Sequence, residues 1–130
     1  MKDNKKVSVY KRDRFSIYKS FGKVYCPAFR SYVYFTLLGW EHLVGSGGNR
    51  KRSWSDVYRR LQLLPFAKRI VQKSHTIQNI KTVRGKTFYA LDSIEVVQIK
   101  KKKVTTKVRV VILDTKTGKK FYSVMDRKMG

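Results

Sequence analysis

The sequence predicts an α+β fold in which a helix pair packs on a twisted antiparallel sheet of four to five strands. Apolar residues recur at spacings of three and four between residues 54 and 73, as on the buried face of a helix. From His75 onward the apolar period changes to two, which is typical of strands with one buried side. A central helix pair followed by a run of strands favours the α+β class.

The helix pair has clear start signals. Ser53 can cap the first helix through its hydroxyl, and Asp56 lies at the third helical position, where a carboxylate suits the helix dipole. Pro65 ends this helix or opens the second one at its first turn. The second helix places Lys68 and Arg69 on its outer side. Both helices are therefore expected to bury an apolar face and to expose a basic one.

Strands are predicted near residues 76–83, 87–91, 94–100, 104–113 and 120–125. Two turns support this division. Arg84-Gly85 fits a tight hairpin, and Gly118 can take the positive φ of a longer one. Before the helices, the aromatic and β-branched stretch 23–38 indicates one or two strands broken near Pro27.

The remaining segments are assigned by their composition. Residues 1–22 are polar and basic, and they are expected to form an N-terminal arm or an edge strand. Residues 23–130 are expected to form a single α+β domain that binds nucleic acid. Residues 39–43 are interpreted as a turn or a short helix, and residues 45–49 as a flexible glycine-rich loop.

The charge points to a polyanionic partner. The 130-residue chain has 31 Lys and Arg against eight Asp and Glu, a formal net charge of +23. Self-repulsion of this size destabilises a compact state, so it usually persists because a polyanion is bound. Nucleic acid fits best, since each phosphate that a Lys or Arg neutralises releases counterions.

Other partners and compartments fit less well. An anionic membrane surface would require a long apolar helix face or a lipidation signal, and the sequence has neither. No apolar run approaches the roughly 18–20 residues of a membrane span, and the charged N-terminus lacks the apolar region of a signal peptide. The single Cys26 excludes an internal disulfide and is expected to be a small buried hydrophobe. These features predict a cytoplasmic protein without a membrane partner, unless it is delivered as part of a larger secreted toxin.

No metal and no cofactor are expected. The acidic residues are dispersed, without the carboxylate pairs of two-metal nucleases, and Cys and His lack the spacing of zinc ligands. The glycine-rich residues 45–48 lack the Gly-Lys-Ser/Thr ending of a phosphate-binding loop.

A ribonuclease can work without a metal. It needs a base for the 2′-hydroxyl proton, an acid for the leaving oxygen and cations for the developing negative charge. His42 is the candidate base, because histidine side chains ordinarily titrate near neutrality and this one precedes a basic cluster. Arg59 and Arg60 are candidate charge stabilisers, and Ser123 is a candidate to orient a phosphate. The alternatives are a structural histidine, solvated arginines and a serine bonded to the sheet backbone. His75 is interpreted as a partner of a helix dipole.

Further side chains are predicted to contact nucleic acid. Residues 100–103 form a run of four lysines, interpreted as a loop or strand end over phosphate. Trp40, Trp54, Tyr89 and Tyr122 are candidates to stack on unpaired bases. The predicted contacts to nucleic acid are Arg50, Lys51, Arg52, Lys68, Arg69, Lys100, Lys101, Lys102, Lys107, Arg109 and Tyr122.

Three stretches resemble the barnase–EndoU–colicin–RelE group of nucleases, in particular its phage and mobile-element toxins. They are Gly39-Trp40-Glu41-His42-Leu43, the basic helix segment of residues 56–65 and the closing strand Phe121-Tyr122-Ser123-Val124. The resemblance covers roughly residues 24–126. It implies helices packed on a four-stranded antiparallel sheet and cleavage of RNA without a metal. His42 would match the conserved histidine, Arg59 or Arg60 the basic helix position and Ser123 the hydroxyl of the last strand.

Two function hypotheses follow. The first is a toxin-like, metal-independent ribonuclease that cleaves RNA by acid–base attack of the 2′-hydroxyl. Its general acid is unassigned, because the sheet has no obvious second catalytic histidine. The second is a non-catalytic RNA- or DNA-binding protein with a strongly basic surface. RNA is favoured over DNA as the partner, and an acidic immunity or antitoxin protein is a further expected partner.

Overall fold

The computed structural model describes residues 4–45, 53–99 and 101–127. They contain four helices and six strands, which confirms the predicted α+β class. In chain order the elements are α1 (Asn4–Phe21), β1 (Lys23–Cys26), β2 (Ser31–Tyr34), α2 (Leu37–Val44), α3 (Trp54–Gln62), α4 (Leu64–Lys73), β3 (Asn79–Val83), β4 (Lys86–Ile99), β5 (Lys102–Thr115) and β6 (Gly118–Arg127).

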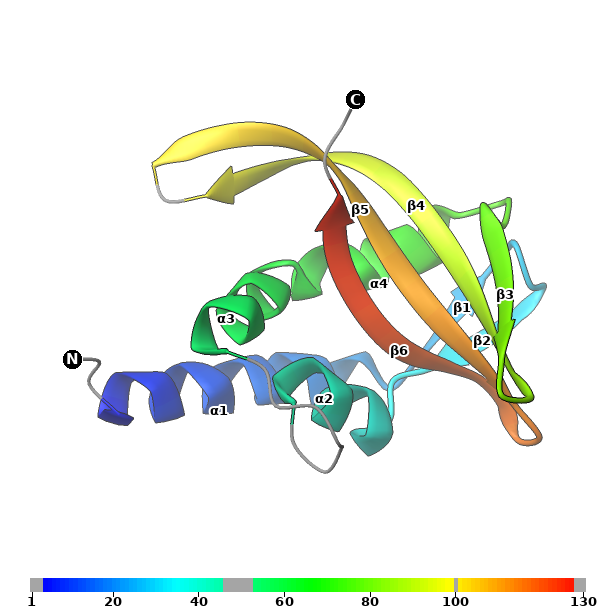
Figure 1. Ribbon diagram of the computed structural model, residues 1–130, viewed down its shortest axis with the longest axis horizontal. Helices are drawn as coiled ribbons and strands as arrows, with labels where there is room; N and C mark the ends of the chain where they lie inside the picture. Colours follow the sequence, from blue (N-terminus) through cyan, green and yellow to red (C-terminus); the bar gives the residue numbers. More distant parts are fainter. Residues whose placement is uncertain (1–3, 46–52, 100, 128–130) are drawn as a thin grey trace.

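One sheet contains all six strands, in the order β1-β2-β6-β5-β4-β3. Neighbouring strands are antiparallel except β2 and β6, which pair in parallel. The prediction of an antiparallel sheet of four to five strands was therefore wrong, because the β1–β2 hairpin joins the same sheet beside the last strand. The sheet is strongly twisted, and the helices lie on one side of it (Figure 1).

The β4–β5 hairpin is the longest feature of the sheet. Residues 87–91 and 94–100, predicted as two strands, belong to the single strand β4, which pairs with β5 from Phe88↔Leu113 to Ile99↔Lys102. Its far end extends beyond the other strands and arches over the helix side (Figure 1). The turn at Arg84-Gly85 is confirmed, with φ values of 51° and 78°.

Helix α1 corrects the interpretation of the N-terminal segment. Residues 4–21 form a helix, not an arm or an edge strand. Its inward side carries Val7, Tyr10, Phe15, Tyr18 and Phe21 at roughly helical spacing, a signal that the surrounding polar and basic residues obscured. Tyr10 packs against Trp54 and Tyr58 of α3. Tyr18 is buried, and its hydroxyl donates to the Thr36 carbonyl at 2.6 Å. Tertiary contacts therefore decide the state of this segment.

The predicted helix pair is confirmed in α3 and α4. The Ser53 hydroxyl accepts the Asp56 amide at 3.2 Å, which is the expected cap. The apolar sides of both helices form the core together with the inner face of the sheet, with Leu61 and Ile70 fully buried.

Cys26 is buried as expected, and burial raises the pKa of its thiol. Among the described residues, no helix is both long and apolar enough to cross a membrane.

Helices replace a strand along the outer edge of β6. Strand β2 pairs with β6 only through Lys119 and Lys120. Beyond that point, Gly39 of α2 lies so close to β6 that a methyl group on it would approach the Phe121 carbonyl oxygen to 2.5 Å. Further along, Arg60 Nη1 of α3 donates to the Val124 carbonyl at 3.4 Å. This cover blocks an edge that would otherwise be open to another strand.

Candidate nucleic-acid interface

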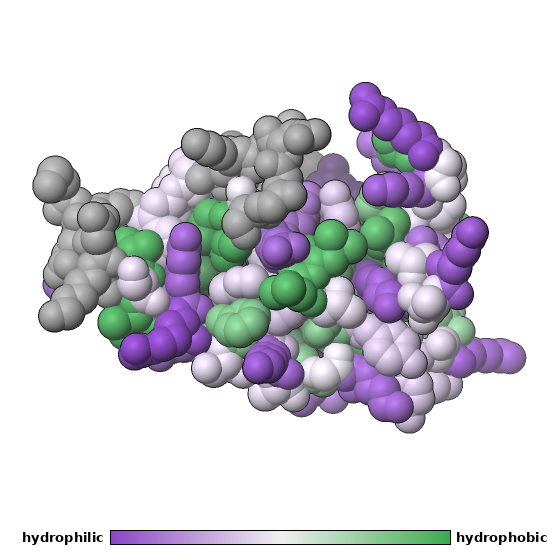
Figure 2. All heavy atoms as spheres, turned by 90° about the horizontal axis from the view of Figure 1, so that it is seen from below, coloured by the Kyte–Doolittle hydropathy of each residue, from purple (hydrophilic) through white to green (hydrophobic). Residues whose placement is uncertain are grey.

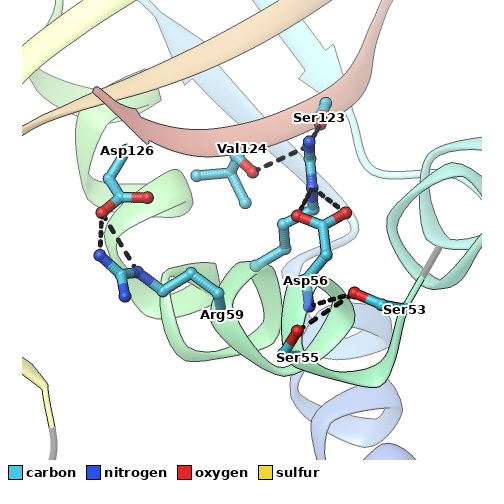
Figure 3. Close-up of polar contacts among 8 residues, drawn as sticks. Ser53, Ser55, Asp56, Arg59, Ser123, Val124 and Asp126 are labelled. Atoms are coloured by element: carbon cyan, nitrogen blue, oxygen red, sulfur yellow. Dashed lines mark hydrogen bonds and ion pairs between the residues drawn. The ribbon is translucent and has the colours of Figure 1, made fainter. Parts of the chain in front are cut away.

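The fold brings three of the four predicted catalytic residues to the contact between α3 and β6. Arg60 Nη1 donates to the Ser123 hydroxyl at 2.5 Å, and the Arg60 guanidinium also pairs with Asp56 at 3.3 Å (Figure 3). Arg59 pairs with Asp126 at the end of β6 (Figure 3). Ser123 is only 1% exposed. In this arrangement Arg59, Arg60 and Ser123 bind α3 to β6, and Ser123 lies inside the protein.

His42 reaches β6 from α2. Its ring stacks on Tyr122, with centroids 3.9 Å apart and an angle of 29° between the planes. Tyr122 also contacts Phe88 of β4, with centroids 5.0 Å apart. Val111 pairs with Ser123 and Ile112 with Phe121, so Tyr122 is the extra residue of a bulge. A bulge of this kind redirects a side chain locally. His42 and Tyr122 both remain partly exposed.

Three of the predicted phosphate contacts have partners within the fold. Arg109 donates to both carboxylate oxygens of Asp92, at 2.7 and 2.9 Å, and these bonds raise its pKa. Arg69 pairs with the buried Glu95, which also accepts from Lys73 at 2.7 Å. Burial alone would raise the pKa of Glu95, but bonds from Lys73, Ser93 and Arg69 lower it. Lys68 lies over the Phe21 ring.

The lysines of the β4–β5 hairpin face solvent. Lys101 occupies the turn, and Lys102 and Lys103 begin β5; all three are exposed. Lys107 is partly exposed further along β5. Within the described part of the chain, none of these four forms an ion pair with an acid. The predicted contacts Arg50, Lys51, Arg52 and Lys100 lie outside the described residues.

The acidic residues are largely used inside the fold. Asp56, Asp92, Glu95, Asp114 and Asp126 each pair with an Arg or Lys. Asp13 also pairs with Arg12 on the surface, so six of the eight acids have a basic partner, and the excess positive charge lies on the remaining cations. On the face formed by α1 and α2, hydrophilic side chains surround separate hydrophobic patches (Figure 2). The exposed apolar residues of these helices are Val9, Ile17, Leu37 and Leu38.

The four aromatic residues predicted to stack on bases pack against other rings of the protein, whereas two other tyrosines are exposed. Trp40 packs on Phe15 and Tyr18, and Trp54 on Tyr10 and Tyr58. Tyr89 packs on Phe29, and Tyr122 on His42. Sequence reasoning missed Tyr25 and Tyr32, which are 49% and 43% exposed. The alternation Lys23-Val24-Tyr25-Cys26 was the signal, because it places valine and cysteine on the opposite face from the tyrosine.

No group of three His, Cys, Asp or Glu residues in the described ranges could hold a metal ion. Comparison of the chain with family models, with curated proteins and with solved structures gives no match.

Proposed function

We propose that the protein binds nucleic acid and that the β4–β5 hairpin supplies the main phosphate contacts. The supporting observation is the distribution of ion pairs. Six acids are paired with an Arg or Lys, whereas the exposed Lys101, Lys102 and Lys103 form no ion pair with a described acid. Cations held apart from carboxylates remain available to phosphates, and each contact releases counterions.

The shape of the hairpin suits this role. Both strands contain 14 residues, and their shared end projects beyond the remaining sheet (Figure 1). A two-stranded β-ribbon is narrow enough to enter the major groove of a duplex, and it can equally lie along a single strand. The lysines at the tip would then meet the phosphates at a distance from the core, so binding needs no rearrangement of the helices.

The test is the salt dependence of binding. We expect labelled RNA or DNA to bind the wild-type protein with an affinity that falls linearly with salt on a logarithmic plot. The slope should be about 0.7–0.9 for each phosphate contacted. We expect a total slope that corresponds to several phosphate contacts. Fluorescence anisotropy over a salt series measures it. Absence of binding at low salt would refute the proposal.

A metal-independent ribonuclease is the second candidate. The observation that favours it is the position of His42, a partly exposed ring stacked on Tyr122 of the last strand. Arg59, Arg60 and Ser123 are engaged within the fold, so this candidate depends chiefly on His42 as the base. A histidine with a pKa near neutrality suits abstraction of the 2′-hydroxyl proton.

The ribonuclease candidate predicts a specific loss. Total RNA incubated with the protein in EDTA should give discrete fragments on a denaturing gel. His42→Ala should slow their appearance by about a hundredfold or more, since removal of a general base has effects of this size. His75→Ala is the matched control, because His75 is exposed after the end of α4. If the RNA stays intact with the wild-type protein, the ribonuclease candidate is rejected and nucleic-acid binding remains the proposed function.

A further inference from the structure

The outer face of the β1–β2 hairpin carries an exposed aromatic pair. Tyr25 and Tyr32 lie directly opposite each other in the two strands. Their ring centroids are 5.7 Å apart, with the planes at 81°. Nearly half of each residue is exposed, although aromatic side chains of this size usually bury most of their surface. An exposed aromatic pair on a sheet is a typical surface for stacking on unpaired bases.

The hairpin backbone that carries these rings is held in place by the core and by α4. Val24, Cys26 and Val33 point to the opposite face of the hairpin and are buried in the core. The turn of the hairpin is tied to the end of α4, because the Ala28 amide donates to the Ser74 carbonyl at 2.9 Å. Tyr25 and Tyr32 are therefore held on a rigid support and need little ordering when a ligand binds.

Three cations lie on or next to the same hairpin. Lys23 Nζ lies 4.6 Å from the centroid of Tyr32. Two residues after Tyr32 in β2, the ring centroid of Tyr34 lies 5.3 Å from Lys120 Nζ. Arg30 is exposed in the hairpin turn with a φ of 51°, a conformation that Gly or Asn would adopt at lower cost.

We infer that this face, formed by Tyr25, Tyr32 and the cations Lys23, Arg30 and Lys120, binds single-stranded nucleic acid. The inference rests on the proposed function and names its substrate class. The two rings stack on unpaired bases, and the three cations neutralise the phosphates that flank them. A duplex keeps its base faces inside the helix, so it can use the cations but not the rings. Single strands are therefore preferred at this face.

The test separates the rings from the charges. Tyr25→Val with Tyr32→Val removes both rings but keeps residues that favour strands, and Tyr25→Phe with Tyr32→Phe is the matched control that keeps the rings. The probe is a labelled single strand of about 20 nucleotides, longer than the usual site size, made as RNA, as DNA and as an abasic DNA with the same phosphates. Affinities are measured by anisotropy, and circular dichroism verifies the fold of each variant.

We expect the valine pair to bind the RNA or DNA strand about tenfold or more weakly than the wild-type protein does, and the phenylalanine pair to bind it normally. Binding to the abasic strand should change by less than about twofold in either variant, because phosphate contacts are unaffected. Unchanged affinity of the valine pair, or an equal loss on the abasic strand, would overturn the inference while leaving the proposed function intact. No binding of any probe by the wild-type protein would overturn both.

Discussion

Replacing Lys101, Lys102 and Lys103 by Gln is expected to lower the affinity for nucleic acid about a hundredfold at roughly 0.15 M salt. Each phosphate contact adds about 0.7–0.9 to the logarithmic salt slope, which corresponds to roughly four- to fivefold in affinity at this salt concentration. Three lost contacts multiply to about a hundredfold. The three side chains are exposed at the end of the hairpin, so the fold should be unaffected.

The measurement is a salt titration of the triple variant beside the wild-type protein. The slope should fall by about two to three, in proportion to the contacts removed. Lys81, Lys86 and Lys116, each changed to Gln, make a matched control, because they are exposed on other parts of the sheet and remove the same charge. An equal loss in the control would mean that overall charge matters and that the hairpin has no special role.

Gly39→Ala is expected to destabilise the protein by about 3 kcal/mol. In an ordinary helix this change stabilises, since glycine costs up to about 1 kcal/mol relative to alanine. Here the added methyl group would lie 2.5 Å from both the Phe121 carbonyl oxygen and the Tyr18 hydroxyl. One of these atoms belongs to the backbone of β6, and the other is held by its bond to Thr36. Relief of the clash therefore requires α2 to move away from the sheet.

Urea unfolding followed by circular dichroism measures this effect. Leu38→Ala is the control, because Leu38 neighbours Gly39 in α2 and is half-exposed. Its removal should change the free energy of unfolding by less than about 1 kcal/mol. A Gly39→Ala protein as stable as the wild type would show that α2 does not pack on β6 as closely as the structure places it.

The helix pair was predictable from the sequence because its signals are local. Ser53 caps α3 through the neighbouring Asp56, and the buried side of each helix repeats at spacings of three and four. The turn at Arg84-Gly85 and the one that ends at Gly118 were also predictable, since tight turns depend on adjacent residues. The excess of positive charge is likewise a property of the sequence alone.

The candidate catalytic residues were predictable in location but not in environment. The sequence placed Arg59 and Arg60 on a helix and Ser123 on the last strand. Only the packing of α3 against β6 gives Arg59 its partner Asp126, which lies 67 positions away, and directs Arg60 to Ser123. Cross-chain partners of this kind depend on which helix covers which strand, and no local pattern encodes that.

The sequence by itself determined the α+β class, the helix pair, most strand positions and the large excess of positive charge. The tertiary structure decided the helical state of residues 4–21, the parallel pairing of β2 with β6 and the bulge at Tyr122. It also decided which aromatic rings stay exposed, with Tyr25 and Tyr32 outside and Trp40 against Tyr18. The physical reason is that burial depends on contacts between segments far apart in the chain, whereas periodicity, caps and turns depend on neighbours.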